Sequence, residues 1–173
     1  MPESIFPVLA TYISPEPLRR RWREGSLSTE WAAAYPEMFD RDDLRIAITQ
    51  AHLGYHYFEW LAAILLFHTQ GFLSLVEKYA YRSHARKRRV IERICDPVSV
   101  EFILGRGRES RVQCPDLLIF KPDGSDWSFC EVKGPSDRLR QEQVTLLAEI
   151  TEATGKAVYI VEFREAPAVQ RAG

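Results

Sequence analysis

The chain has 173 residues, a net charge of −1 at pH 7, 46% hydrophobic residues and 27% charged residues. These values are typical of one soluble globular domain with room for an appended helical region. A net charge this close to zero excludes a protein that binds polyanions over its whole surface, so a nucleic-acid site would require local clusters of basic residues.

The cysteines and the N-terminus bear on the cellular compartment. Cys95, Cys114 and Cys130 are odd in number and lack metal-site spacing, which favours reduced thiols. The N-terminus shows no basic-then-apolar leader pattern. The longest strongly apolar stretch, at 57–67, contains a glutamate and falls short of the ~20 residues that span a bilayer. We therefore expect a cytoplasmic protein without a membrane segment.

The first 50 residues predict an extended start followed by short helices. Residues 1–15 contain three prolines and no helical period, which indicates an extended lead-in. Helices are expected at 17–24, at 28–35 and at 40–50. The first of these helices carries arginines that either contact DNA or form a solvated helix face: Arg19, Arg20, Arg21 and Arg23.

Residues 54–70 form the most apolar segment and predict a core helix. Glu59 lies within it among aromatic and aliphatic neighbours, where a buried carboxylate is costly unless something compensates its charge. A hydrogen bond, a side chain turned to solvent and a metal site all remain open as explanations. His52 and His56 have the i, i+4 spacing of zinc ligands, but no third ligand is evident, which favours ordinary hydrogen bonding.

A basic segment follows this helix. Residues 82–93 contain six basic residues and one acidic residue, a local charge of +5. Such a patch either neutralises DNA phosphates with counterion release or forms a solvated helix face. Asp96-Pro97 should end the helix, and the β-rich residues 98–104 predict the first strand of a sheet. The candidate DNA contacts lie in this segment and in the polar loop at 105–111: Arg82, Arg86, Lys87, Arg88, Arg89, Arg106, Arg108 and Arg111.

The residues with the clearest chemical signal lie in a predicted β-hairpin. Apolar strands at 117–120 and 127–133 are joined by a Pro-Asp-Gly turn. Because side chains alternate along a strand, Glu131 and Lys133 share one face, and Asp116 lies where the first strand begins. Carboxylate oxygens suit a hard cation such as Mg²⁺, and an adjacent ammonium can stabilise charge on phosphorus. An isolated Glu-x-Lys is more often a surface pair, and the hairpin alone leaves that alternative open.

A helix and a strand complete the chain. A turn at 134–137 leads into a helix at about 138–154. Gln143 falls on the apolar stripe of this helix, so its amide needs an internal partner such as a strand backbone. Residues 156–163 predict the last strand, and 166–173 a frayed tail.

The chain resembles a known nuclease family in a series of residues around the hairpin. These residues are Pro115-Asp116, then Glu131-Val132-Lys133-Gly134-Pro135, Asp137-Arg138-Leu139 and Gln143. They resemble the VRR-NUC branch of the PD-(D/E)XK nuclease superfamily, which includes the nuclease domain of the Fanconi-associated nuclease and standalone bacterial and phage proteins. The likeness is clear over about 110–163, weaker back to about residue 50, and absent over 1–45.

The resemblance implies an α/β fold of the restriction-endonuclease kind, with a small mixed sheet of four or five strands flanked by helices. The nuclease domain would span 51–165. Residues 1–50 would form a helical extension outside this core.

The resemblance also implies metal-dependent hydrolysis of DNA phosphodiester bonds. Asp116 and Glu131 would bind Mg²⁺ or Mn²⁺, together with the backbone carbonyl of Val132. Lys133 would position the attacking water and stabilise the transition state, and Gln143 would position substrate or water.

One further metal ligand stays open. In this superfamily an acidic residue on the first core helix often completes the metal site, and Glu59 is the best match to that position. Glu77 is the competing candidate. We favour Glu59 because its apolar neighbours demand a reason for its charge.

The substrate class also follows from the resemblance. Family members act on branched or flapped DNA, which implies structure-selective cleavage, and a homodimer is reasonable if the substrate is a four-way junction. One alternative is a non-catalytic DNA-binding or protein-docking module that kept the fold. Another is a defence-type nuclease that acts on duplex DNA or RNA.

Overall fold

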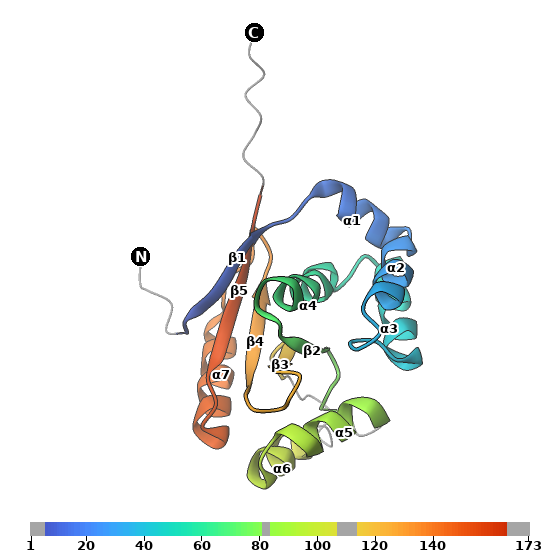
Figure 1. The fold of residues 1–173 in the computed structure, drawn as a ribbon. Coiled ribbons are helices and arrows are strands. Elements are labelled where there is room, and N and C mark those ends of the chain that lie inside the picture. The colour runs from blue at the N-terminus through green and yellow to red at the C-terminus, as the bar shows by residue number, and fades with distance from the viewer. Residues whose placement is uncertain (1–5, 81–83, 107–113, 166–173) are drawn as a thin grey trace.

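A five-stranded mixed sheet forms the centre of the molecule (Figure 1). The computed structural model describes residues 6–80, 84–106 and 114–165. The strand order is β1-β5-β4-β3-β2, in which β1, β5 and β4 are parallel and β4, β3 and β2 are antiparallel neighbours. The strands are β1 (Val8–Ile13), β2 (Leu73–Val76), β3 (Leu117–Phe120), β4 (Trp127–Lys133) and β5 (Val158–Arg164). This confirms the α/β class and the small mixed sheet predicted from the sequence.

Helices cover both faces of the sheet. The helices are α1 (Glu16–Arg23), α2 (Ser26–Ala34), α3 (Arg41–His52), α4 (Tyr57–Gln70), α5 (Ala85–Ile94), α6 (Pro97–Arg106) and α7 (Gln141–Thr154). The first four pack into one hydrophobic cluster and the last three into another. Leu117 and Ile119 of β3 belong to the first cluster, whereas Leu118 and Phe120 belong to the second. Because both faces are covered, β3 and β4 are buried along their whole length.

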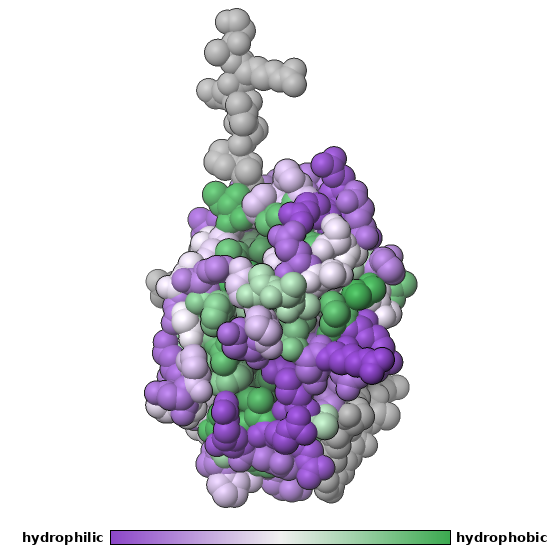
Figure 2. Space-filling view, turned by 45° about the vertical axis from the view of Figure 1, so that its right-hand side comes forward, coloured by the Kyte–Doolittle hydropathy of each residue, from purple (hydrophilic) through white to green (hydrophobic). Residues whose placement is uncertain are grey.

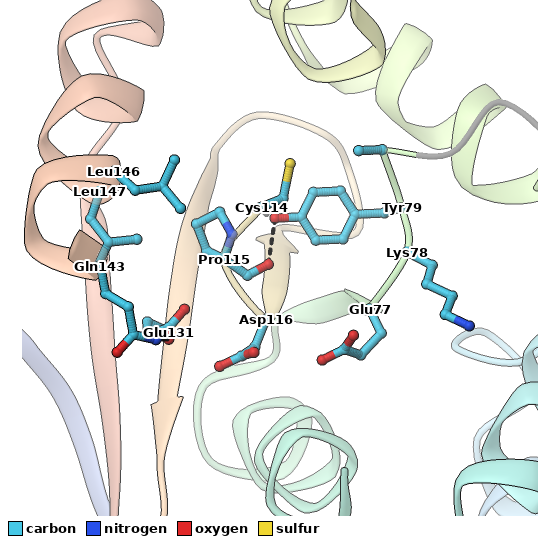
Figure 3. A pocket seen from close by; sticks show the side chains of 11 residues that line it. Glu77, Lys78, Tyr79, Cys114, Pro115, Asp116, Glu131, Gln143, Leu146 and Leu147 are labelled. Carbon is cyan, nitrogen blue, oxygen red and sulfur yellow. Dashed lines mark hydrogen bonds between the residues drawn. The ribbon is translucent and has the colours of Figure 1, made fainter. Parts of the chain in front are cut away.

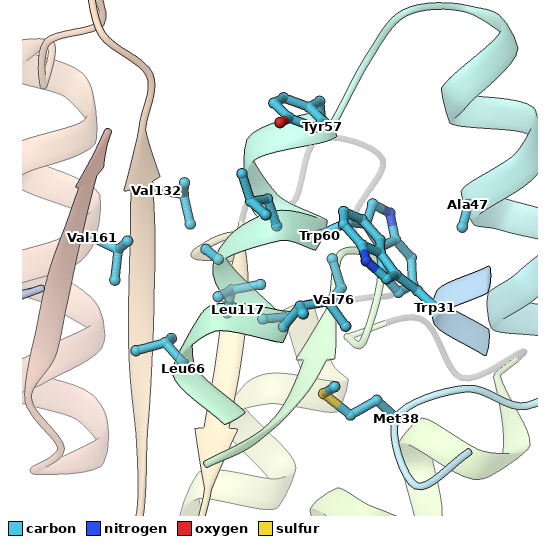
Figure 4. Close-up of a cluster of buried hydrophobic side chains, with 14 of the residues drawn as sticks. Trp31, Met38, Ala47, Tyr57, Trp60, Leu66, Val76, Leu117, Val132 and Val161 are labelled. Carbon is cyan, nitrogen blue, oxygen red and sulfur yellow. The ribbon is translucent and has the colours of Figure 1, made fainter. Parts of the chain in front are cut away.

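The N-terminal segment contributes to the sheet as well as to the helical cover. Its expected extended lead-in contains β1, which pairs in parallel with β5 at the edge of the sheet. Side chains from α2, α3 and their connection belong to the same buried cluster as Trp60 of α4, and Trp31 of α2 lies beside its ring (Figure 4). The ring of Phe39 stacks on Trp60 with centroids 4.9 Å apart. The division of the chain at residue 50 stays a prediction, and the tail at 166–173 lies outside the described residues.

The strand predicted at 98–104 is wrong, because this segment is the helix α6. The Asp96-Pro97 pair that was expected to end a helix also starts the next one. The carboxylate of Asp96 accepts hydrogen bonds from the backbone N–H of Ser99 at 3.0 Å and from its hydroxyl at 2.6 Å. This cap outweighs the β preference of the valines that follow, since capping satisfies donors that a free helix start would leave unpaired.

Other boundaries differ less. The four residues of β2, at the opposite edge from β1, were not predicted because so short a run carries little periodic signal. The helix α7 begins at Gln141 rather than at about residue 138. In the described part of the chain, no helix combines the length and the apolar character needed to cross a membrane.

Candidate active site

Asp116 is fixed between β4 and the end of β2. It precedes β3, and its Oδ2 accepts a hydrogen bond from the backbone N–H of Val132 at 2.8 Å. Its backbone carbonyl accepts one from the N–H of Glu77 at 2.9 Å. Because Val132 stands between Glu131 and Lys133 in the chain, this bond brings the Asp116 carboxylate to the functional end of β4.

Glu131, Lys133 and Gln143 form a connected polar group. Oε1 of Glu131 accepts hydrogen bonds from Nζ of Lys133 at 2.9 Å and from Nε2 of Gln143 at 3.0 Å. Oε1 of Gln143 accepts from the same Nζ at 3.4 Å and from the Arg140 N–H at 3.2 Å. Glu131 and Lys133 are both only 6% exposed, so they do not form the ordinary surface pair that the sequence left open. The amide of Gln143 finds its partners here rather than on a strand backbone.

Glu59 and Glu77 converge on one histidine. Nδ1 of His56, at the start of α4, lies 3.1 Å from Oε1 of Glu59 and 3.0 Å from Oε1 of Glu77. Possible ligand atoms of these three residues all lie within 4.8 Å of one another. The hydrogen bonds to Glu59 and Glu77 raise the pKa of His56 to about 10, against the opposing effect of burial. The structure therefore brings together both candidates that the sequence offered for the further metal ligand.

A buried lysine holds the backbone that carries Glu77. Glu77 and Lys78 both have φ of 49°, a left-handed conformation that is costly for residues other than glycine. Nζ of Lys87 donates to the carbonyls of Val76 at 2.5 Å and of Glu77 at 2.8 Å, and lies 3.1 Å from Oδ1 of Asp43. Lys87 thus stabilises the turn that aims Glu77 at the site.

The electrostatics of the site favour an added positive charge. Burial raises the pKa of Asp116 well above its usual range, and the nearby carboxylates of Glu131, Glu59 and Glu77 raise it further. Burial likewise raises the pKa of Glu131, although Lys133 opposes the shift. The negative charges of Glu131, Glu59 and Glu77 all act on the Asp116 carboxylate, and such carboxylates repel one another unless cations offset them. Their oxygens are the donors that Mg²⁺ and Mn²⁺ prefer, so the residues present fit a hard divalent cation.

A hollow of about 280 Å³ opens beside these groups (Figure 3). Asp116 and Glu77 reach into it from the sheet side, and Glu131 and Gln143 line it near α7. The hydroxyl of Tyr79 donates to the Pro115 carbonyl at 2.6 Å and fixes the backbone next to Asp116. The hollow therefore offers a substrate access to the carboxylates.

The VRR-NUC domain family model matches residues 63–162, more than half of the chain. The chain belongs to the VRR-NUC family. The matched range contains Asp116, Glu131, Lys133 and Gln143, and it begins just after Glu59. The resemblance stated from the sequence is thereby confirmed, and the chain is a member of a nuclease family.

Comparison with individual proteins adds little to this assignment. No curated protein matches the chain. A solved structure titled "Crystal structure of paFAN1 bound to 2nt 5'flap DNA with gap" matches with 19% identity and a TM-score of 0.29. The match covers 87% of this chain and 22% of that one, so the chain spans under a quarter of that protein's length. At this TM-score the likeness supports no structural inference.

The predicted DNA-contact residues of this VRR-NUC chain fall into different environments. Lys87 is 1% exposed and therefore internal, whereas Arg86 is partly buried and binds Asp43 and the Met38 carbonyl. Arg88 is half exposed and pairs with Glu92 at 2.8 Å, and Arg89 is exposed. Arg106 ends α6. Three further candidates lie outside the described residues: Arg82, Arg108 and Arg111.

The sequence missed two features of this VRR-NUC site. His56 was considered only with His52, although its i, i+3 relation to Glu59 could have indicated a direct pair. The internal role of Lys87 carried no local signal, because its partner Asp43 is far away in the chain. The catalytic and metal-binding roles assigned from the resemblance stay predictions.

Proposed function

We propose that the chain is a metal-dependent nuclease that hydrolyses DNA phosphodiester bonds, with a preference for flapped or branched DNA. The proposal rests above all on the meeting of Asp116, Glu131 and Lys133 at one end of β4, beside an accessible hollow. Membership of a nuclease family supports it. The presence of Asp116, Glu131 and Lys133 argues against the alternative of a non-catalytic binding module that kept only the nuclease fold.

Asp116 and Glu131 would hold Mg²⁺ or Mn²⁺, with the Val132 carbonyl and with Glu59 or Glu77 as further donors. When bound, such a cation supplies a more acidic water and offsets charge on the scissile phosphate. The protein's own part is to fix these oxygens. The hydrogen bond from the Val132 N–H orients Asp116, and the bonds from Lys133 and Gln143 orient Glu131.

Lys133 would act on the phosphate. Its ammonium is buried and held by Glu131 and Gln143, so it needs no reorganisation to face charge that develops in the transition state. Gln143 in turn fixes the position of the ammonium and would place a water or a substrate oxygen with its remaining hydrogen-bonding capacity.

The choice of substrate is the finer part of the proposal. Flap or junction selectivity is what the resemblance implies, and a four-way junction would suit a homodimer. A cytoplasmic location belongs to the same proposal. Duplex DNA and RNA are the competing substrates.

The test is cleavage of labelled single-stranded, duplex, 5′-flap and four-way-junction DNA, and of duplex RNA, with Mg²⁺ or Mn²⁺. The matched control is the double variant Glu131→Gln/Lys133→Ala, which removes both charges, with circular dichroism to verify that it is folded. We expect metal-dependent cleavage of flap or junction DNA by the wild type alone. Equal cleavage by wild type and double variant, or DNA binding without any turnover, would contradict the nuclease proposal.

A further inference from the structure

A second hollow, of about 470 Å³, lies between α1 and the start of α4. We call it the α1–α4 hollow. It shares His56 and Glu59 with the cluster of His56, Glu59 and Glu77, so it adjoins the candidate active site. Its other walls include two arginines and two aromatic residues: Arg19, Arg23, Tyr55 and Phe58.

The two arginines line the hollow from one face of α1. Arg19 and Arg23 are four residues apart, so they lie on one face of the helix, and both are exposed. The guanidinium of Arg19 stands over the ring of Phe58, 5.5 Å from its centroid. Phe58 in turn packs so closely on Gly134 that an added Cβ there would lie 3.1 Å from the ring. Because Gly134 directly follows Lys133, these contacts connect Arg19, through Phe58, to the end of the strand that carries the proposed catalytic lysine.

Tyr55 offers an aromatic surface on the same hollow. Its side chain is 63% exposed, whereas its carbonyl accepts a hydrogen bond from Nε1 of the fully buried Trp22 at 3.0 Å. The backbone is therefore anchored to the core while the ring faces solvent. Figure 2 turns the α1 to α3 side of the molecule toward the viewer, where hydrophilic and hydrophobic side chains are interleaved. An anchored aromatic ring beside guanidinium groups is a common setting for an unpaired base.

We propose that the α1–α4 hollow binds one strand of the DNA substrate next to the reacting phosphate, with phosphates on Arg19 and Arg23 and a base stacked on Tyr55. The inference rests on the proposed function in one respect, since it takes the site formed by Asp116, Glu131, Glu59 and Glu77 as the reacting centre. The negative charge of these carboxylates repels DNA, and the arginines supply positive charge at the border of the site. A single strand fits better than a duplex, because only an unpaired base has a free face to stack on the ring.

The same assignment divides the arginine run of α1. Neither Arg20 nor Arg21 lines the hollow, so these two form the solvated part of the helix, and Arg23 lines it although its guanidinium lies 3.7 Å from the Glu16 carboxylate. Arg20→Ala is therefore a control matched in charge, helix and exposure to Arg19→Ala.

The experiment measures binding of a fluorescently labelled oligothymidylate by anisotropy, in EDTA so that no cleavage occurs. For Arg19→Ala/Arg23→Ala we expect the slope of log K against log salt to fall by about 1.4, because each single-strand phosphate contact contributes about 0.7. Tyr55→Ala should weaken binding about tenfold through lost stacking. Arg20→Ala should leave the salt slope close to that of the wild type.

Equal effects of Arg19→Ala and Arg20→Ala, or unchanged binding by Tyr55→Ala, would overturn the inference. A bromodeoxyuridine-substituted strand gives an independent measure in the wild type. Photocrosslinking should label the peptide that contains Tyr55, and labelling confined to α5 would contradict the proposal. Binding is measured without metal, so the two proposals can fail separately. If the protein binds DNA through this hollow but cleaves none, only the nuclease proposal is contradicted. If it cleaves DNA but its binding is insensitive to these substitutions, only the role of the hollow is contradicted.

Discussion

The internal position of Lys87 makes the substitution Lys87→Met a demanding test of the structure. The side chain is 1% exposed, and its ammonium binds the carbonyls of Val76 and Glu77 and the carboxylate of Asp43. Methionine keeps much of the length and the apolar stem but supplies neither the charge nor the donors. The buried Val76 carbonyl, the partly buried Glu77 carbonyl and the Asp43 carboxylate would each lose a partner.

The expected cost follows from these contacts. Removing one member of a buried ion pair typically destabilises a protein by about 3–5 kcal/mol. Arg86 still binds the other oxygen of Asp43 at 2.7 Å, which favours the lower part of that range. For a chain of this size, such a loss corresponds to a fall in melting temperature of roughly 6–20 °C. The turn at Glu77 and Lys78 also loses its support, so Mn²⁺ affinity should fall even where the variant is folded.

Urea unfolding and calorimetric Mn²⁺ binding measure the two effects. The control is Arg88→Met, on the same helix but half exposed, whose stability should stay within about 0.5 kcal/mol of the wild type. A Lys87→Met variant as stable as this control would show that the ammonium does not lie inside the molecule. Loss of stability with unchanged Mn²⁺ affinity would refute the link to Glu77.

Three more predictions concern single side chains. Lys133→Ala should lower kcat about 10²–10³-fold on flap DNA with little loss of binding, as measured by single-turnover cleavage and anisotropy, and a change in binding alone would contradict the role of the ammonium. Burial raises the pKa of Asp43, but the charges of Lys87 and Arg86 outweigh this effect and hold the pKa in the folded protein below 3.8. The free energy that the ionised Asp43 contributes to folding is therefore fully present above pH 3.8 and is lost as the pH falls through the lower pKa of the folded state. Urea unfolding from pH 6 to pH 2.5 should show this loss in the wild type but not in Asp43→Asn, and parallel pH curves would count against the buried pair. Gly134→Ala should cost about 1–3 kcal/mol because its Cβ would meet Phe58 at 3.1 Å, and Phe58→Leu should restore part of that loss in thermal melts.

The hairpin could be predicted from the sequence because its signals are local. A short turn between two apolar runs fixes which strands pair, and side-chain alternation then places Glu131 beside Lys133. The long apolar helix α4 was equally evident. What these segments share is that the residues deciding their structure are neighbours in the chain.

Features that depend on distant residues could not be predicted in the same way. β1 is a strand because β5, far along the chain, offers it an edge. Lys87 belonged to a run of basic residues that suggested a DNA surface, and only the position of Asp43 on α3 explains its burial. Glu77 reaches the site through an unusual backbone turn that no local pattern indicates.

The error at α6 has a different origin. Its valines and isoleucine favour a strand by propensity, but the hydrogen bonds between Asp96 and Ser99 start a helix. The exposures then follow a helical pattern, with Val98 68% exposed and Ile103 buried. The Asp-Pro-x-Ser sequence was itself a capping signal, so this element could have been predicted correctly.

The most direct test of the proposed chemistry is to soak crystals of the protein in MnCl₂ and record anomalous diffraction at a wavelength where manganese scatters strongly. The account predicts a peak within coordination distance of carboxylate oxygens from both Asp116 and Glu131, with Glu59 or Glu77 as a further ligand. A manganese peak bound elsewhere, or carboxylates that stay apart with no peak between them, would contradict it.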